Sequence, residues 1–92
     1  MTDKEVERRR RIRLSVAAYA YEVHDDSVMS DGEFDKECLL VDISQTTGNR
    51  KLDNFFKNYF DPSTGSWIHK HPEKNKLEQI YQRVYKHAGW GS

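Results

Sequence analysis

The chain has 92 residues, a formal net charge of zero and one cysteine. A domain of this size buries only about two thirds of its unfolded surface, so we expect one domain, residues 1–92, with shallow sites rather than a deep catalytic cleft. Cys38 has no partner for an internal disulfide, and no apolar run approaches the roughly 20 residues of a membrane span. Because the N-terminus is charged, unlike a signal peptide, we expect a cytoplasmic protein with no membrane contact.

The charges are sorted by segment. Residues 1–13 carry six basic and three acidic side chains, whereas residues 22–42 carry eight acidic and one basic side chain. Such blocks create local potentials that select a partner even when the total charge is zero.

The first expected helix runs from Lys4 to about Val23. Its packed face is marked by apolar residues at helical spacing, which are Ile12, Val16, Tyr19 and Val23. Residues 1–13 offer almost no apolar face, so we expect this charged helix start to project partly into solvent or onto a partner.

A second helix is expected from Asp31 to about Asp42. Ser30 followed by Glu33 is a capping box, in which the serine hydroxyl accepts the hydrogen bond of the Glu33 backbone N–H. Apolar residues repeat behind it at Phe34, Cys38 and Val41. The first two helices therefore form a predicted hairpin around an acidic loop.

A polar connection over residues 44–49 leads to the clearest amphipathic pattern, which holds Leu52, Phe55, Phe56, Tyr59 and Phe60. Pro62 ends this helix. Trp67 and Ile68 are assigned to a loop, a last helix is expected from about Pro72 to His87, and residues 88–92 form a loose tail. We predict an all-α domain of about four helices built around the N-terminal hairpin. Its predicted core holds Phe34, Phe55, Phe56, Tyr59, Ile80, Tyr81 and Val84.

Few residues suggest chemistry. His69 and His71 are spaced so that two imidazoles can bind one metal ion, but two histidines are a weak signal, and the alternative is that both lie on the surface. No pattern of nucleophile, histidine and acid is visible, and no glycine-rich phosphate loop. We predict neither a metal site nor an enzyme.

Arginines concentrate in the first helix, at Arg8, Arg9, Arg10, Arg11 and Arg13. They form a basic patch that suits phosphates or an acidic partner. Helical spacing, however, spreads the five arginines around the helix axis. The alternative to a binding patch is therefore a helix start whose charged side chains are only solvated.

The hairpin resembles a known family. Tyr-x-Tyr before the turn and Ser-Asp-x-Glu-Phe-Asp after it are similar to the small N-terminal helical domain (Ia) of bacterial NAD-dependent DNA ligases, over about Leu14 to Leu40. The resemblance implies a hairpin that closes over the nicotinamide mononucleotide (NMN) half of NAD. It assigns ring stacking to Tyr21 and further contacts to Asp31 and Asp35.

Two positions depart from the family pattern. Glu22 stands where the family has a histidine, so a carboxylate would face an anionic phosphate, and Phe34 stands where it has a second tyrosine and lacks the hydroxyl donor. We therefore expect weakened binding and no cofactor. The other parts of a ligase are missing from this length, which implies a stand-alone protein of the kind that phages encode.

These observations favour a non-catalytic interaction or accessory factor of phage or prophage origin. It would bind another protein through the acidic loop, with Asp25 and Asp26, or through the arginine-rich helix. Two alternatives remain: a weak NMN or NAD-binding module, and a nucleic-acid-binding accessory protein that uses the arginines. A further alternative is that the hairpin binds no ligand. The acidic residues of the loop would then only stabilise the second helix, whose N-terminus carries a partial positive charge.

Overall fold

The computed structural model describes residues 2–86, which form four α-helices and two shorter helical turns. The elements are α1 (Asp3–His24), α2 (Asp31–Leu40), α3 (Arg50–Tyr59), the 3₁₀ turn η1 (Ser66–Lys70), α4 (Lys74–Ile80) and the π-helical turn η2 (Tyr81–Lys86). No strand occurs among these residues, and the predicted all-α class is confirmed. The expected tail and the expected end of the last helix at His87 lie outside the described residues.

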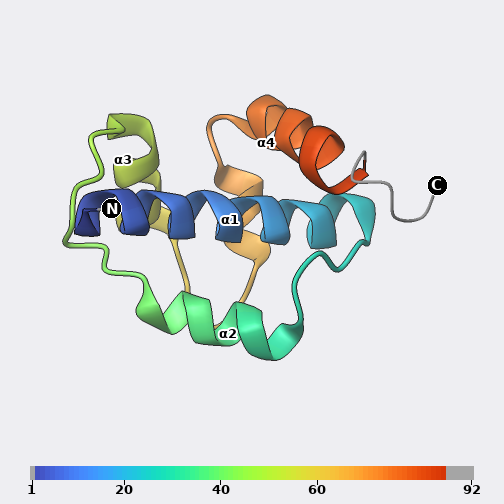
Figure 1. Ribbon diagram of the computed structural model, residues 1–92, viewed down its shortest axis with the longest axis horizontal. Coiled ribbons are helices and arrows are strands. Elements are labelled where there is room, and N and C mark those ends of the chain that lie inside the picture. The colour runs from blue at the N-terminus through green and yellow to red at the C-terminus, as the bar shows by residue number, and fades with distance from the viewer. Residues whose placement is uncertain (1, 87–92) are drawn as a thin grey trace.

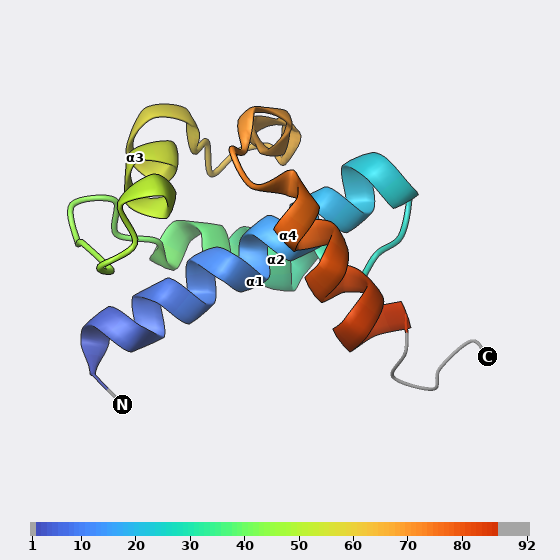
Figure 2. The ribbon, with the colours of Figure 1, turned by 90° about the horizontal axis from the view of Figure 1, so that it is seen from above.

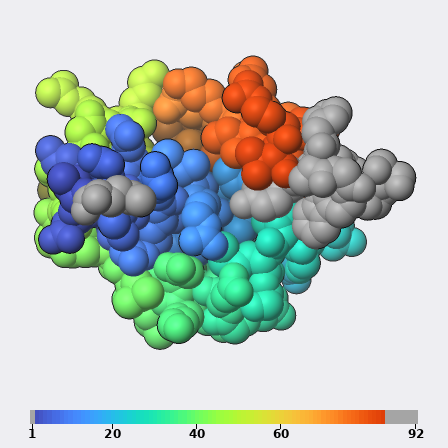
Figure 3. Space-filling model, viewed as in Figure 1, coloured from blue at the N-terminus to red at the C-terminus, as the bar shows by residue number. Residues whose placement is uncertain are grey.

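The long helix α1 is the axis of the fold. Figure 1 shows α2 on one side of α1, with α3 and α4 on the other. The space-filling view shows α1 at the surface between them on this face (Figure 3). Thr2 caps its start by accepting a hydrogen bond from the Glu5 N–H. Asp25 ends it in the left-handed conformation, with φ of 53°, a region that aspartate tolerates better than most residues.

The hairpin is present as predicted. The Ser30 hydroxyl accepts the Glu33 N–H at 3.2 Å, and α2 begins at Asp31. It runs back along α1 (Figure 1) but ends at Leu40, two residues before the expected end. The reason is that the backbone of Asp42 is bound by α1 side chains instead of continuing the helix.

A buried arginine fixes this connection. The Arg11 guanidinium donates to Glu7 at 2.8 Å, to Asp53 at 3.0 Å, and to the backbone carbonyls of Asp42 and Gln45. Arg11 is fully buried and Glu7 is 2% exposed. We call these five residues the Arg11 clamp. The prediction that the first half of α1 projects into solvent is therefore wrong at Glu7 and Arg11, because the clamp packs this part of α1 against α3 and the loop before it.

The core lies around α1 and receives side chains from α2, α3, η1, α4 and η2. Its fully or almost fully buried apolar side chains are Leu14, Val16, Ala18, Ala20, Cys38, Phe56, Ile68 and Tyr81. The prediction that Trp67 lies in a loop is wrong, because Trp67 is 4% exposed in η1 and its ring centre lies 5.3 Å from that of Phe56 and 5.1 Å from that of Phe60. The turn η1 thus supplies core residues that the sequence pattern did not reveal.

Two predicted core residues are exposed, and the prediction was wrong for them. Tyr59 is 52% exposed because the core-facing stripe of α3 is already covered at Leu52, Phe55 and Phe56, and Tyr59 lies in its last turn. Val84 is 48% exposed because it lies in η2, where the wider π-helical turn interrupts the 3.6-residue repeat.

Candidate functional site

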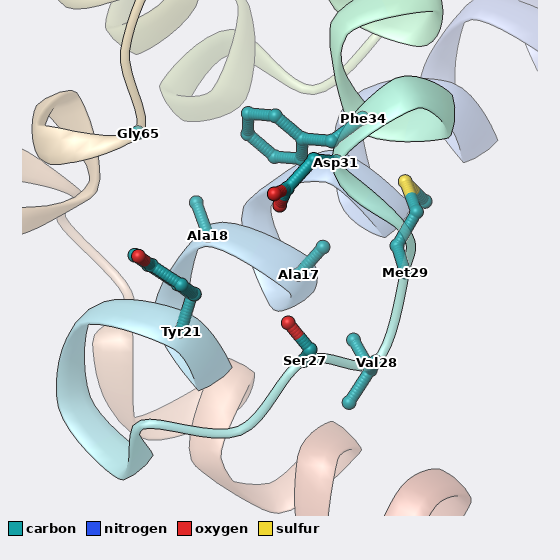
Figure 4. A pocket seen from close by; sticks show the side chains of 9 residues that line it. All are labelled: Ala17, Ala18, Tyr21, Ser27, Val28, Met29, Asp31, Phe34 and Gly65. Carbon is teal, nitrogen blue, oxygen red and sulfur yellow. The ribbon is translucent and has the colours of Figure 1, made fainter.

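A pocket of about 190 Å³ opens at the hairpin (Figure 4). It is lined by Ala17, Ala18, Tyr21, Ser27, Val28, Met29, Asp31, Phe34 and Gly65. We call it the hairpin pocket. The last turns of α1, the loop, the first turn of α2 and the connection before η1 all contribute to it, so a site forms where four segments meet.

Small residues create the space. Ala17 and Ala18 present only methyl groups, and Figure 4 shows them between Tyr21 on α1 and Phe34 on α2. A Cβ atom added at Gly65 would lie 3.8 Å from both the Ala18 Cβ and the Phe34 Cζ, which is ordinary contact. A longer side chain at Gly65 therefore has room at its Cβ and would occupy the pocket beyond it.

The pocket is apolar and aromatic with one carboxylate. Tyr21 is 56% exposed and Phe34 is half-buried, so both rings remain accessible to a ligand. Asp31 is exposed at the start of α2 and supplies a negative charge beside the Phe34 ring (Figure 4). Such a site suits a ring or an apolar side chain that carries, or lies next to, a positive charge.

The structure brings three of the five predicted cofactor residues together. Tyr21, Asp31 and Phe34 line one pocket, whereas Glu22 and Asp35 are not among its lining residues. Glu22 instead pairs with His69 of η1, at 2.9 Å between Oε1 and Nε2. The carboxylate that we expected to face a ligand phosphate is thus engaged by an imidazole outside the pocket.

The two loop aspartates differ. Asp25 is exposed and its backbone N–H caps α1 through the Ala20 carbonyl. Asp26 is half-buried and accepts a hydrogen bond from the Tyr81 hydroxyl. That hydrogen bond is the largest of the effects that raise the pKa of Tyr81 to about 12, followed by burial. Asp26 therefore holds the loop to η2 and does not offer both oxygens to a partner.

A polar cluster around Glu78 anchors the end of α1, and sequence reasoning missed it. One oxygen of Glu78 accepts from Tyr19 at 2.7 Å and lies 2.7 Å from His24 Nε2, while the other accepts from Gln82 at 2.6 Å. The His24 ring also stacks on Tyr81 at 4.5 Å between centres. We call these five residues the Glu78 cluster.

Glu78 and Tyr19, two members of the Glu78 cluster, have shifted pKa values. Hydrogen bonds from Gln82, Tyr19 and His24, in that order, lower the pKa of Glu78 to about 2. Burial, followed by the bond to Glu78, raises the pKa of Tyr19 to about 12. Because a carboxylate with this pKa is a weak base near neutral pH, the cluster suits positioning of α1 better than proton transfer.

The arginines of α1 do not form one surface. Arg11 is buried in the clamp, so its assignment to a partner-binding or nucleic-acid surface is wrong. Arg10 is half-buried in ion pairs of 3.0 Å with two glutamates. Only Arg8, Arg9 and Arg13 are exposed. The basic patch expected from the sequence is therefore much reduced.

The two histidines have separate roles. His71 is 7% exposed, and its Nδ1 accepts the Glu73 N–H at 3.0 Å, so the expectation that both histidines lie on the surface is wrong for His71. Burial lowers the pKa of its imidazole. His69 is exposed and pairs with Glu22. Residues 2–86 contain no group of three or more His, Cys, Asp or Glu side chains that could hold a metal ion.

Comparison with protein-family models, curated proteins and solved structures gives no match to this chain. A search of the helices in the described part of the chain finds none with the length and apolarity needed to cross a membrane.

Proposed function

We propose that the chain is a non-catalytic protein-binding module that recognises its partner through the hairpin pocket. The observation that carries this proposal is an apolar pocket with aromatic walls that is lined in part by the acidic segment, residues 22–42. Its volume of about 190 Å³ suits one ring-sized side chain, since a cavity of roughly 150 Å³ holds benzene. The partner segment is one with an aromatic or large apolar anchor beside lysine or arginine.

The size of the pocket sets the strength of binding. Burying one large apolar side chain contributes roughly 1.5–3 kcal/mol, and exposed charges such as Asp25 and Asp31 add mainly to the rate of association. A single anchor therefore gives weak affinity, and tighter binding needs further contacts on the rim.

The proposal is tested with short peptides that contain one phenylalanine flanked by lysines, and with the same peptides carrying alanine in place of phenylalanine. Backbone amide shifts of the chain are followed by NMR. We expect saturable shifts around Tyr21 and Phe34 with the phenylalanine peptide only. Gly65→Leu, which fills the pocket, should abolish them. The matched control is Gly32→Leu, since an added Cβ at Gly32 has no atom within 4 Å.

Equal shifts with the alanine peptide, or shifts that survive Gly65→Leu, would show that the pocket does not hold the anchor. Replacing the flanking lysines by glutamates should weaken binding, because like charges would then meet at the acidic rim. Unchanged affinity after that replacement would contradict the assigned partner chemistry.

The second candidate is a weak NMN or NAD-binding module. It is favoured by the meeting of Tyr21, Asp31 and Phe34 at one pocket, three positions that the ligase resemblance assigns to the nicotinamide half of NAD. The changes at Glu22 and Phe34 still argue against tight binding. We expect no NMN-induced shifts at millimolar ligand, and weak binding after Glu22→His combined with Phe34→Tyr. Saturable NMN binding by the unmodified chain, without a response to peptides, would favour this candidate.

The relation to ligases, the phage origin and the cytoplasmic location belong to the same proposal and stay predictions. The relation to ligases is supported by the hairpin motifs and by the placement of three motif residues around one pocket, and the cytoplasmic location rests only on the composition of the sequence.

A further inference from the structure

A second hollow surface lies away from the hairpin pocket. Two hollows of about 370 and 410 Å³ open beside α3 and the segment that joins η1 to α4, and both are lined by Lys51 and Pro72. Figure 2 shows α3 and η1 on the same face of the molecule. We call the two hollows together the lysine groove. It shares no lining residue with the hairpin pocket.

Positive charge dominates this groove. Its lining includes four ammonium groups, those of Lys51, Lys70, Lys74 and Lys76, against the single carboxylate of Glu73. Glu73 is bound by Lys76 at 2.8 Å, and the other three lysines make no ion pair within residues 2–86. The hydrogen bond from Lys76, together with the positive charges of Lys76 and Lys51, lowers the pKa of the Glu73 carboxyl group.

An aromatic ring lies in the same groove. Tyr59 is 52% exposed, and its ring is held against Phe55 at 5.8 Å between centres. Two amide side chains of α3, those of Asn54 and Asn58, line the same hollow and can donate or accept hydrogen bonds. An accessible ring between amides and unpaired lysines is the combination that holds single-stranded nucleic acids, in which phosphates bind cations and unpaired bases stack on aromatic rings.

We propose that the lysine groove binds single-stranded nucleic acid, with phosphates at Lys51, Lys70 and Lys74 and a base stacked on Tyr59. A single strand fits better than a duplex, because the bases of a duplex are already stacked on one another and leave no free face for Tyr59. The site uses none of the arginines of α1. It does not depend on the hairpin pocket, so it stands if the proposed function fails.

The test measures fluorescence anisotropy of a labelled oligothymidylate of about 12 nucleotides against the full chain. With three phosphate contacts, affinity should fall roughly 20-fold between about 50 and about 200 mM salt. Lys51→Ala with Lys74→Ala should weaken binding and flatten this salt dependence. Tyr59→Ala should weaken binding roughly 5- to 150-fold with the salt dependence unchanged.

The matched control is Arg8→Ala with Arg9→Ala, which removes two exposed cations outside the groove and should leave affinity within about twofold. All variants are at exposed positions, and thermal unfolding checks that each still folds. Absence of binding at low salt, or a loss caused by the arginine variant instead of the lysine variant, would overturn the assignment. Polyglutamate serves as a competitor without bases. If it binds as tightly as the oligothymidylate, and if Tyr59→Ala leaves its binding unchanged, the assignment is overturned in favour of an acidic protein partner.

Discussion

Replacing Arg11 with alanine should destabilise the domain severely. The guanidinium makes four hydrogen bonds, and its removal leaves the Glu7 carboxylate, which is 2% exposed, without its buried cation. The Asp53 carboxylate and two backbone carbonyls lose a donor as well. Breaking a buried ion pair from one side costs about 3–5 kcal/mol, a large share of the roughly 5–15 kcal/mol that stabilises an ordinary domain.

The assay is urea unfolding followed by circular dichroism at the helix minimum. With a dependence of the free energy of unfolding on urea of roughly 1–2 kcal/mol per molar for a small domain, a loss of about 3–5 kcal/mol should lower the midpoint by about 1.5–5 M. Arg8→Ala, in the exposed turn beside the clamp, is the control and should shift the midpoint little, as surface changes do. Equal midpoints for the two variants would refute the clamp as a source of stability.

Three further predictions concern the cap, the Glu78 cluster and the cysteine. Ser30→Ala removes the acceptor of the Glu33 N–H and should lower the free energy of unfolding by about 1 kcal/mol, and coinciding urea midpoints would contradict this. The pKa of Glu78 falls from 4.5 to about 2 in the folded chain, so its stabilisation is present above pH 4.5 and is lost as the pH falls toward 2. Unfolding of Glu78→Gln should therefore depend less steeply on pH over that range, and equal slopes would exclude this role. Burial raises the pKa of Cys38 to about 11, so its thiol should resist iodoacetamide in the folded chain and react in urea; rapid alkylation without urea would show that the thiol is accessible.

The sequence predicted the features that depend on neighbouring residues. The cap at Ser30, the start of α2 and the packed stripe at Phe55 and Phe56 follow from spacings of three or four residues. The burial of Arg11 could not be predicted in this way, because its partner Asp53 lies 42 residues away and nothing nearby marks one arginine among five. The exposure of Val84 follows from a π-helical turn that a 3.6-residue pattern cannot reveal.

The hairpin pocket was predicted in part, for a geometric reason. Tyr21, Asp31 and Phe34 meet because they lie near the facing ends of one hairpin. Glu22 and Asp35 each follow a pocket residue directly, and one helical step turns a side chain about 100° away from its neighbour. The lysine groove had no sequence signal, since its lysines are dispersed over residues 51–76 and are brought to one surface only by the folded arrangement of α3, η1 and the start of α4.

The Glu78 cluster also decides whether the hairpin is a separable unit. The last turns of α1 are held by Glu78, more than fifty residues beyond Tyr19 and His24, and Glu78 is itself held by a hydrogen bond from Gln82. A fragment that stops after Gly48 would contain the whole hairpin and neither of these two residues. Such a fragment should not fold alone, whereas mixing it with the remaining half of the chain should restore helical structure in both. We therefore expect that the hairpin alone does not fold when it is transferred to another protein, and that a chain cut in the polar connection over residues 44–49 gives two pieces that fold only together.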